Sequence, residues 1–210
     1  MSLSSNPAPA RSDLAAVVPP AEPAPGRRHP FLVHGALLSI GALAWSASIV
    51  ALGVDPVGNP RELLLFGLGS GLFQFGLLAL LRVLWRTRAL GAGRIARAAL
   101  IVESVLVSLA IGSTLADAFT LSDLNQPVWA ALDAFWPLSM LGMFVIGIRI
   151  AIAGRWTGIS RFWPLVAESW AAVVLPINGI LGGEVAQYVA AAHLIVGYTV
   201  LGMLVARKTN

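Results

Sequence analysis

The chain has 210 residues, of which 57% are hydrophobic and only 11% are charged, and its formal net charge is +4. A soluble domain carries about 25% charged residues to cover its wet surface. The composition therefore excludes a disordered chain, a coiled coil and a nucleic-acid-binding protein, and it indicates a bundle of membrane-spanning helices. The sequence has no cysteine, which excludes disulfides, iron–sulfur clusters and thiolate-bound zinc.

Residues 1–29 differ from the rest of the chain, because they are rich in proline and alanine and contain no aromatic side chain. Such a segment cannot bury enough apolar surface to offset the conformational entropy that it would lose on ordering. We therefore expect residues 1–29 to form a disordered cytoplasmic tail and residues 30–208 to form one transmembrane domain.

Six apolar runs follow this tail. Each is close to the ~20 residues that a helix needs to cross ~30 Å of hydrocarbon. No run alternates with a period of two, as the strands of a membrane β-barrel do. The sequence thus predicts an all-α, polytopic integral membrane protein, a six-helix bundle with spans at about 31–53, 62–84, 95–116, 128–152, 161–181 and 185–206.

The basic residues predict the orientation of the bundle. Of the 14 lysine and arginine residues, all but Arg61 fall on one side of a six-span alternation. Because positively charged loops stay in the cytoplasm, both termini are expected there. The predominance of arginine, with abundant alanine and glycine, points to a high-GC bacterium, so we expect the bacterial cytoplasmic (inner) membrane as the location.

Ionisable side chains inside spans are costly and usually face the interior of a bundle. Counting from the nearest basic residue at 1.5 Å per residue, we expect a polar layer roughly 9–14 Å from the cytoplasmic surface. Its predicted members are His34, Gln74, Glu103, Arg149, Glu168 and Tyr198. We hypothesise that Arg149 is the counterion of Glu103, Glu168 or both. The alternative is a structural network that fixes helix register, with Arg149 extending to the inner surface.

A second polar group, Asp133, Asn178 and His193, belongs to the outer and middle part of the membrane. Asp133 fits a solvated helix end. His193 fits either a packing residue or a proton-carrying or ligand-contacting group, because imidazole titrates near neutral pH. Two prolines, Pro137 and Pro176, are expected to bend the fourth and fifth spans.

Small residues spaced four apart predict close helix packing. Gly67 and Gly71 form a GxxxG pair, and Gly35 and Ser39 repeat the same spacing. Such pairs let two backbones approach closely within lipid.

The sequence carries no signature of enzymatic chemistry. His34 and His193 are expected at different depths, which argues against a haem, and neither an HExxH motif nor a phosphate-binding loop is present. We therefore expect no metal, no cofactor and no enzymatic activity. The expected partners are the lipid bilayer and another membrane protein or a second copy of the chain, without nucleic acid.

Three functions stay open at this stage. The short loops and missing catalytic motifs favour a non-enzymatic accessory, scaffold or sensor component that binds membrane partners or lipid. The first alternative is a small solute, ion or proton-coupled transporter that uses the Glu/Arg/His layer. The second is an intramembrane lipid-modifying enzyme with Glu and His as acid and base. A continuous polar cavity would favour transport, whereas a dry interior would argue against it.

Overall fold

The computed structural model describes residues 29–54, 56, 59–123 and 125–208. Its elements are helices, and none of these residues lies in a β-strand, so the predicted all-α class is confirmed. The predicted tail over residues 1–29 lies outside the described residues, apart from His29, and stays a prediction.

Six helical segments are long and apolar enough to cross a membrane. The first three are single helices, and the last three are each divided. In chain order they are α1 (Leu32–Leu52), α2 (Pro60–Arg86), α3 (Arg94–Ala118), α4 with α5 (Pro127–Asp133 and Phe135–Ala153), α6 with α7 (Ile159–Glu168 and Trp170–Leu181), and α8 with the π-helix η1 and α9 (Gly183–His193, Leu194–Thr199 and Val200–Ala206). Every predicted boundary lies within two residues of the observed one.

Local chemistry explains where several helices begin and end. Pro60 and Pro127 occupy the first helical position of α2 and α4, where no backbone N–H is needed. Asn59 caps α2, because its side-chain oxygen accepts a hydrogen bond from the Arg61 N–H at 3.0 Å. Gly154 ends α5 in the left-handed conformation, with φ 60°.

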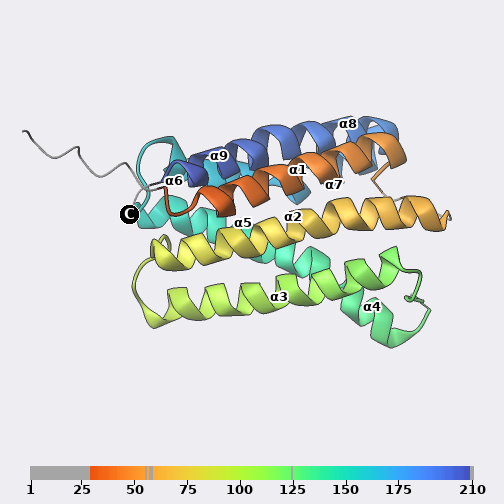
Figure 1. The fold of residues 1–210 in the computed structure, drawn as a ribbon, viewed down its shortest axis with the longest axis horizontal. Coiled ribbons are helices and arrows are strands. Elements are labelled where there is room, and N and C mark those ends of the chain that lie inside the picture. The colour runs from red at the N-terminus through yellow and green to blue at the C-terminus, as the bar shows by residue number, and fades with distance from the viewer. Residues whose placement is uncertain (1–28, 55, 57–58, 124, 209–210) are drawn as a thin grey trace, which may run out of the picture.

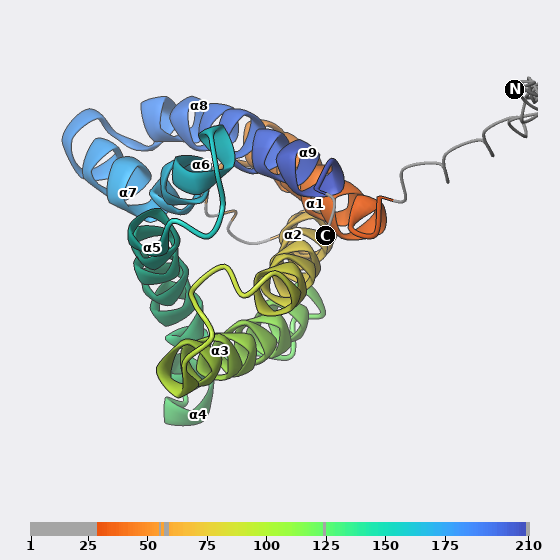
Figure 2. The ribbon, with the colours of Figure 1, turned by 90° about the vertical axis from the view of Figure 1, so that its left-hand side faces the viewer.

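The six segments stand side by side in chain order and close into a ring (Figure 1 and Figure 2). α2 packs between α1 and α3, α5 packs between α3 and α6, and η1 and α9 return to α1. α1 begins and α9 ends at the same end of this ring, beside the α2–α3 and α5–α6 loops. We name this the basic end, because it carries Arg86, Arg88, Arg94, Arg155 and Lys208, and we name the opposite end, with Glu62, Asp117, Asp123 and Glu184, the acidic end.

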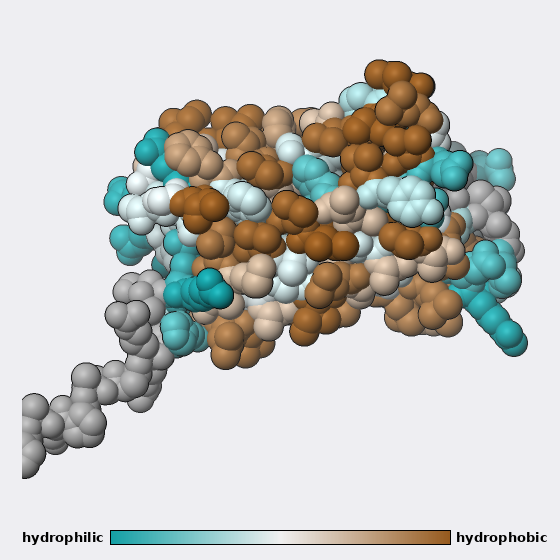
Figure 3. Space-filling view, turned by 90° about the horizontal axis from the view of Figure 1, so that it is seen from above, coloured by the Kyte–Doolittle hydropathy of each residue, from teal (hydrophilic) through white to brown (hydrophobic). Residues whose placement is uncertain are grey.

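The outer surface between the two ends is apolar. Figure 3 shows a broad band of hydrophobic side chains across the middle of the face that it draws, with hydrophilic residues gathered at both ends. Large apolar side chains of the helices, such as Leu141, Ile152 and Leu175, are exposed. A water-soluble monomer rarely exposes a continuous apolar surface of this extent, so the surface suits a hydrocarbon environment.

Glycine sets the closest approaches inside the ring. A Cβ atom at Gly35 of α1 would overlap the carbonyl oxygen of Gly202 in α9, and a Cβ atom at Gly202 would overlap the hydroxyl of Ser39. The Gly35/Ser39 pair is therefore the contact that closes the ring. In the predicted GxxxG pair, Gly67 packs on Ala118 of α3, whereas a Cβ atom at Gly71 would meet nothing within 4 Å.

We expect Gly35→Ala to destabilise the bundle by about 1–3 kcal/mol, because the added methyl group must push two backbones apart. Gly112→Ala is the matched control, since a Cβ at that helical position has no neighbour within 4 Å. Thermal unfolding of the purified protein in detergent measures both variants. Equal melting temperatures for Gly35→Ala and Gly112→Ala would show that the α1–α9 contact is not tight.

Candidate functional site

A buried hydrogen bond joins the fifth and sixth candidate spans. The hydroxyl of Tyr198 donates to Oε2 of Glu168 at 2.6 Å, and both side chains are buried. Glu168 is the last residue of α6, and Tyr198 lies in η1. Both residues therefore lie where a span departs from a regular α-helix.

Side chains contact the backbone carbonyl groups at the break between α6 and α7. The hydroxyl of Ser169 donates to the carbonyl of Val166 at 2.8 Å, and Nε2 of His193 lies 3.0 Å from the same oxygen and 3.2 Å from that of Ala167. Side chains that enter the backbone hydrogen-bond ladder are a common cause of helix kinks. His193 thus packs against the break and contacts the backbone of α6.

The π-helix η1 is stabilised in the same way. Nε1 of Trp163 donates to the carbonyl of Gly197 at 2.9 Å, and Oγ of Ser39 donates to that of Thr199 at 3.0 Å. Gly197 also lets η1 approach α6, because a Cβ there would lie 3.1 Å from Cα of Ala167. π-helical turns are rare and often occur at functional sites. Here the turn brings Tyr198 to Glu168.

A second carboxyl group, that of Glu103 in α3, is buried in the same layer. Its side chain is 2% exposed, as is that of Glu168. It packs directly on Gly142 of α5, where any Cβ atom would overlap the carboxyl oxygen. Glu103 is close enough to interact electrostatically with Glu168 and Tyr198. One oxygen of each carboxyl group, Oε1, is buried without a hydrogen-bond partner in the part of the chain that the structure describes.

The hypothesised pairing of Arg149 with these carboxyl groups does not occur among the described residues. Arg149 is exposed, and its Nη2 lies 4.0 Å from the position that a Cβ of Gly91 would take in the α2–α3 loop. The reason is depth. Glu103 lies nine residues inside α3, or ~14 Å, whereas Arg149 lies four residues from the end of α5, or ~6 Å. The long side chain therefore extends to the basic end.

Two other predicted members of the layer also lie at different depths. His34 is two residues inside α1, near the basic end, and contacts the ring of Phe31 edge-on. Gln74 is near the middle of α2, where its amide nitrogen donates to Oγ1 of Thr114 at 2.7 Å. Of the six predicted residues, the structure brings Glu103, Glu168 and Tyr198 together.

The predicted outer group does not form one site. Asp133 is the exposed last residue of α4, Asn178 is exposed near the end of α7, and His193 contacts α6 as described above. The fourth span is interrupted at Ala134. Pro137 lacks the backbone N–H that would donate to the carbonyl of Asp133 in a regular helix. α7 continues as a helix through Pro176, and the interruption of the fifth span lies at Ser169 instead.

A cavity of about 640 Å³ enters the ring from the acidic end, and we call it the acidic-end cavity. Asp117 and Asp133 line it, and the hydroxyl of Ser122 donates a hydrogen bond to Asp117. Its inner wall includes Gln74 and Trp45. Oε1 of Gln74 and Nε1 of Trp45 are both buried and lack a hydrogen-bond partner among the described residues, so an acceptor and a donor remain available to a bound molecule.

Aromatic rings separate this cavity from the carboxyl pair. The ring of Trp45 stacks on Phe73 with centroids 4.9 Å apart, and Phe73 meets the ring of Tyr198 edge-on at 4.7 Å. Trp136 and Trp170 contact Trp45 at 5.4 and 5.2 Å and also line the cavity. A single phenylalanine ring thus lies between the cavity wall and the tyrosine that binds Glu168.

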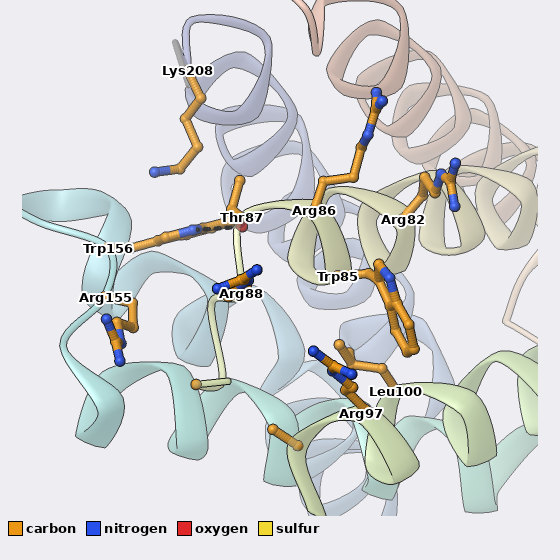
Figure 4. A pocket seen from close by; sticks show the side chains of 12 residues that line it. Arg82, Trp85, Arg86, Thr87, Arg88, Arg97, Leu100, Arg155, Trp156 and Lys208 are labelled. Atoms are coloured by element: carbon orange, nitrogen blue, oxygen red, sulfur yellow. Dashed lines mark hydrogen bonds between the residues drawn. The ribbon is translucent and has the colours of Figure 1, made fainter. Parts of the chain in front are cut away.

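A second cavity, of about 860 Å³, opens at the basic end, and we call it the basic pocket (Figure 4). Its cationic lining residues are Arg82, Arg86, Arg88, Arg97, Arg155 and Lys208. Leu100 of α3 also lines it, and Glu103 follows one turn later on the same helix. The carboxyl pair therefore lies between two cavities that enter from opposite ends.

Several residues of the acidic-end cavity were missed in the sequence, among them Ser70, Ser113 and Trp45. The spacing of polar residues in the sequence does indicate some of them. Ser70 and Gln74 in α2, and Ser113 and Asp117 in α3, are each four residues apart, which is the spacing of neighbours on one helix face. Trp45 has no polar residue four positions away in its own helix.

Comparison with known proteins adds no assignment to this site. The chain matches none of the protein-family models, none of the curated proteins and none of the solved structures with which it was compared. A function must therefore be argued from the carboxyl pair and the two cavities.

We expect Tyr198→Phe to lower the free energy of unfolding by about 1–3 kcal/mol, because it leaves the buried Glu168 without its hydrogen-bond donor. The chain has two tyrosines, and Tyr188→Phe is the matched control, because Tyr188 is 59% exposed. Unfolding in detergent measures the difference. A loss of the same size in both variants would contradict a specific role for the Tyr198–Glu168 bond.

Proposed function

We propose that the protein resides in the bacterial cytoplasmic membrane with both termini in the cytoplasm, and that it couples proton movement to the movement of a small solute. One observation carries this proposal. Two buried carboxyl groups, Glu103 and Glu168, lie between cavities that open at opposite ends of the ring, and no basic side chain of the described chain interacts with either.

The chemistry of the pair suits a proton carrier. A carboxyl group buried without a counterion is most stable in its uncharged, protonated form, and intramembrane carboxyl groups serve as proton relays in pumps and transporters. When Glu168 loses its proton, the hydroxyl of Tyr198 stabilises the carboxylate through the hydrogen bond that it already donates. Glu103 can take up that proton once it has released its own, and a water molecule must carry the proton, because no hydrogen bond joins the two carboxyl groups among the described residues.

The acidic-end cavity supports a small organic cation as the solute. Its volume falls within the ~300–1,000 Å³ of ordinary ligand sites. Asp117 and Asp133 attract a positive charge, and the indole rings of Trp136 and Trp170 offer surfaces that bind cations. Access from the cavity to the carboxyl pair requires Phe73 to move, and the irregular segments at Ser169 and η1 are the elements that we expect to rearrange.

Two other functions have less support from the geometry. An accessory or scaffold protein, which the sequence alone favours, has no need of internal cavities or of unpaired buried carboxyl groups. A lipid-modifying enzyme would need His193 beside a carboxyl group as acid and base. His193 instead contacts the backbone carbonyls of Val166 and Ala167.

Proton flux in liposomes tests the proposal. With a pH-sensitive dye inside and an inward gradient of choline or ethidium, the wild type is expected to move protons, and Glu103→Gln and Glu168→Gln are expected to reduce the flux to that of empty liposomes. Glutamine keeps the shape of the side chain but cannot carry the proton. Glu184→Gln is the control, because Glu184 is exposed at the acidic end.

The elution volume and helix content of each variant must equal those of the wild type, so that lost flux reports chemistry and not misfolding. The proposal is wrong if the wild type moves neither protons nor either cation above the empty-liposome rate. It is also wrong if Glu184→Gln abolishes flux as completely as the two buried substitutions do.

Single cysteines test the orientation, since the natural chain has none. Asn125 is exposed in the loop after α3, and Thr157 is exposed in the loop after α5. We expect a membrane-impermeant maleimide to label Asn125→Cys in intact cells and to label Thr157→Cys only after permeabilisation. The reverse pattern would place the termini outside.

A further inference from the structure

The basic pocket gathers cations from separate parts of the chain. Arg82 and Arg86 come from α2, Arg97 from α3, Arg155 from the α5–α6 loop and Lys208 from the end of α9. In Figure 4, Arg88 lies in the middle of the pocket, between Trp156 on one side and Arg97 on the other. None of the described residues that line the pocket is acidic, so this part of the chain gathers positive charges there with no carboxylate among the lining residues.

The pocket wall is built by specific contacts. The indole of Trp156 is buried and donates from Nε1 to Oγ1 of Thr87 at 3.1 Å, and Thr87 in turn donates to the carbonyl of Val83 at 2.8 Å. Nζ of Lys208 lies 4.0 Å from the centre of the Trp156 ring. The end of α2, the α5–α6 loop and the segment after α9 therefore contact one another at the wall of the pocket.

The backbone at Arg88 is held in an unusual conformation. Its φ is 51°, in the left-handed region that residues other than glycine seldom adopt. Hydrogen bonds from Arg88 N–H to the Trp85 carbonyl at 3.2 Å and from Gly91 N–H to the Arg88 carbonyl at 2.9 Å close the turn. With the Ala89 N–H also bonded to the Leu84 carbonyl at 3.0 Å, this is the left-handed C-terminal cap of α2, and it places the Arg88 side chain in the pocket lining.

An apolar groove continues from the basic pocket along the outside of α2 and α3. It has a volume of about 480 Å³ and includes Leu78, Leu81 and Val105. The groove and the pocket share three lining residues, Arg82, Trp85 and Leu100. A cationic hollow that leads into an apolar groove matches a molecule with an anionic head and a hydrocarbon chain.

We propose that the basic pocket binds the phosphate headgroup of an anionic phospholipid, with one acyl chain in the α2–α3 groove. Guanidinium groups bind phosphate oxygens in a bidentate manner. Basic pockets on the cytoplasmic side of transmembrane helices are typical headgroup sites, and tryptophans such as Trp85 and Trp156 prefer the depth of the headgroups. Neither Glu103 nor Glu168 lines this pocket, so lipid binding can be measured whether or not the protein transports a solute.

Binding is tested on the purified full-length protein in a neutral detergent, by native mass spectrometry and thermal shift. We expect dioleoyl phosphatidylglycerol to bind at least about tenfold more tightly than dioleoyl phosphatidylcholine, which has the same chains and no net charge. Arg88→Gln with Arg97→Gln is expected to remove this preference. Arg61→Gln, which removes one positive charge at the acidic end, is the control for position and should keep it. Equal binding of the two lipids by the wild type overturns the proposal.

A groove substitution separates a lipid from a free phosphate. Ser104 lines the groove but not the basic pocket, so Ser104→Phe should weaken phosphatidylglycerol binding without removing any cation. Inorganic phosphate at the same concentration should not compete. If phosphate displaces the lipid and Ser104→Phe binds it as tightly as the wild type, the lipid assignment is wrong and the pocket takes a soluble phosphate. Should Arg88→Gln fail to fold, Ser104→Phe and the comparison of the two lipids still decide the outcome.

Discussion

The structure depends on one constraint, that the backbone N–H and C=O groups of helices apolar enough to cross a membrane must find partners within the protein. The last three helical segments are each irregular, and in two of them, at Ser169 and in η1, neighbouring side chains bond the backbone carbonyl groups. Trp163 and Ser39 bond the carbonyls of η1, and His193 contacts those at the Ser169 break. These side-chain contacts hold the two irregular segments against each other. The Tyr198–Glu168 hydrogen bond is the result, so the candidate site is a product of backbone satisfaction as much as of polar side chains.

The six spans could be predicted because helix rise and bilayer thickness leave little freedom in the length of an apolar run. The same regular rise predicts a shared depth for Glu103, Glu168 and Tyr198, and the structure places these three side chains near one another. It failed for Arg149 because the count began at arginines that do not mark the helix ends: Arg97 lies inside α3, whereas Arg155 lies beyond the end of α5. An error of a few residues at each anchor adds up to a difference of ~8 Å in depth.

The irregular backbone and the aromatic layer could not have been read from the sequence, for a physical reason. A π-helix at Leu194–Thr199 forms because donors from α1 and α6 are present, and those donors are distant in the chain. Likewise, the wall of the acidic-end cavity needs Trp45, Trp136 and Trp170 to meet from three different spans. Periodicity within one helix describes which face is polar, but not which rings from other helices will cover it.

The positive charge at the basic end bears on both proposals. The cations of the basic pocket lie near one end of α3, and Glu103 lies one turn beyond Leu100, which lines that pocket. Their positive potential opposes the passage of a proton or a cation towards the basic end. An anionic headgroup seated among them would neutralise that potential and lower the electrostatic barrier beside Glu103. If the protein carries protons as proposed, a lipid bound there would control how readily the buried carboxyl pair exchanges its proton at the basic end.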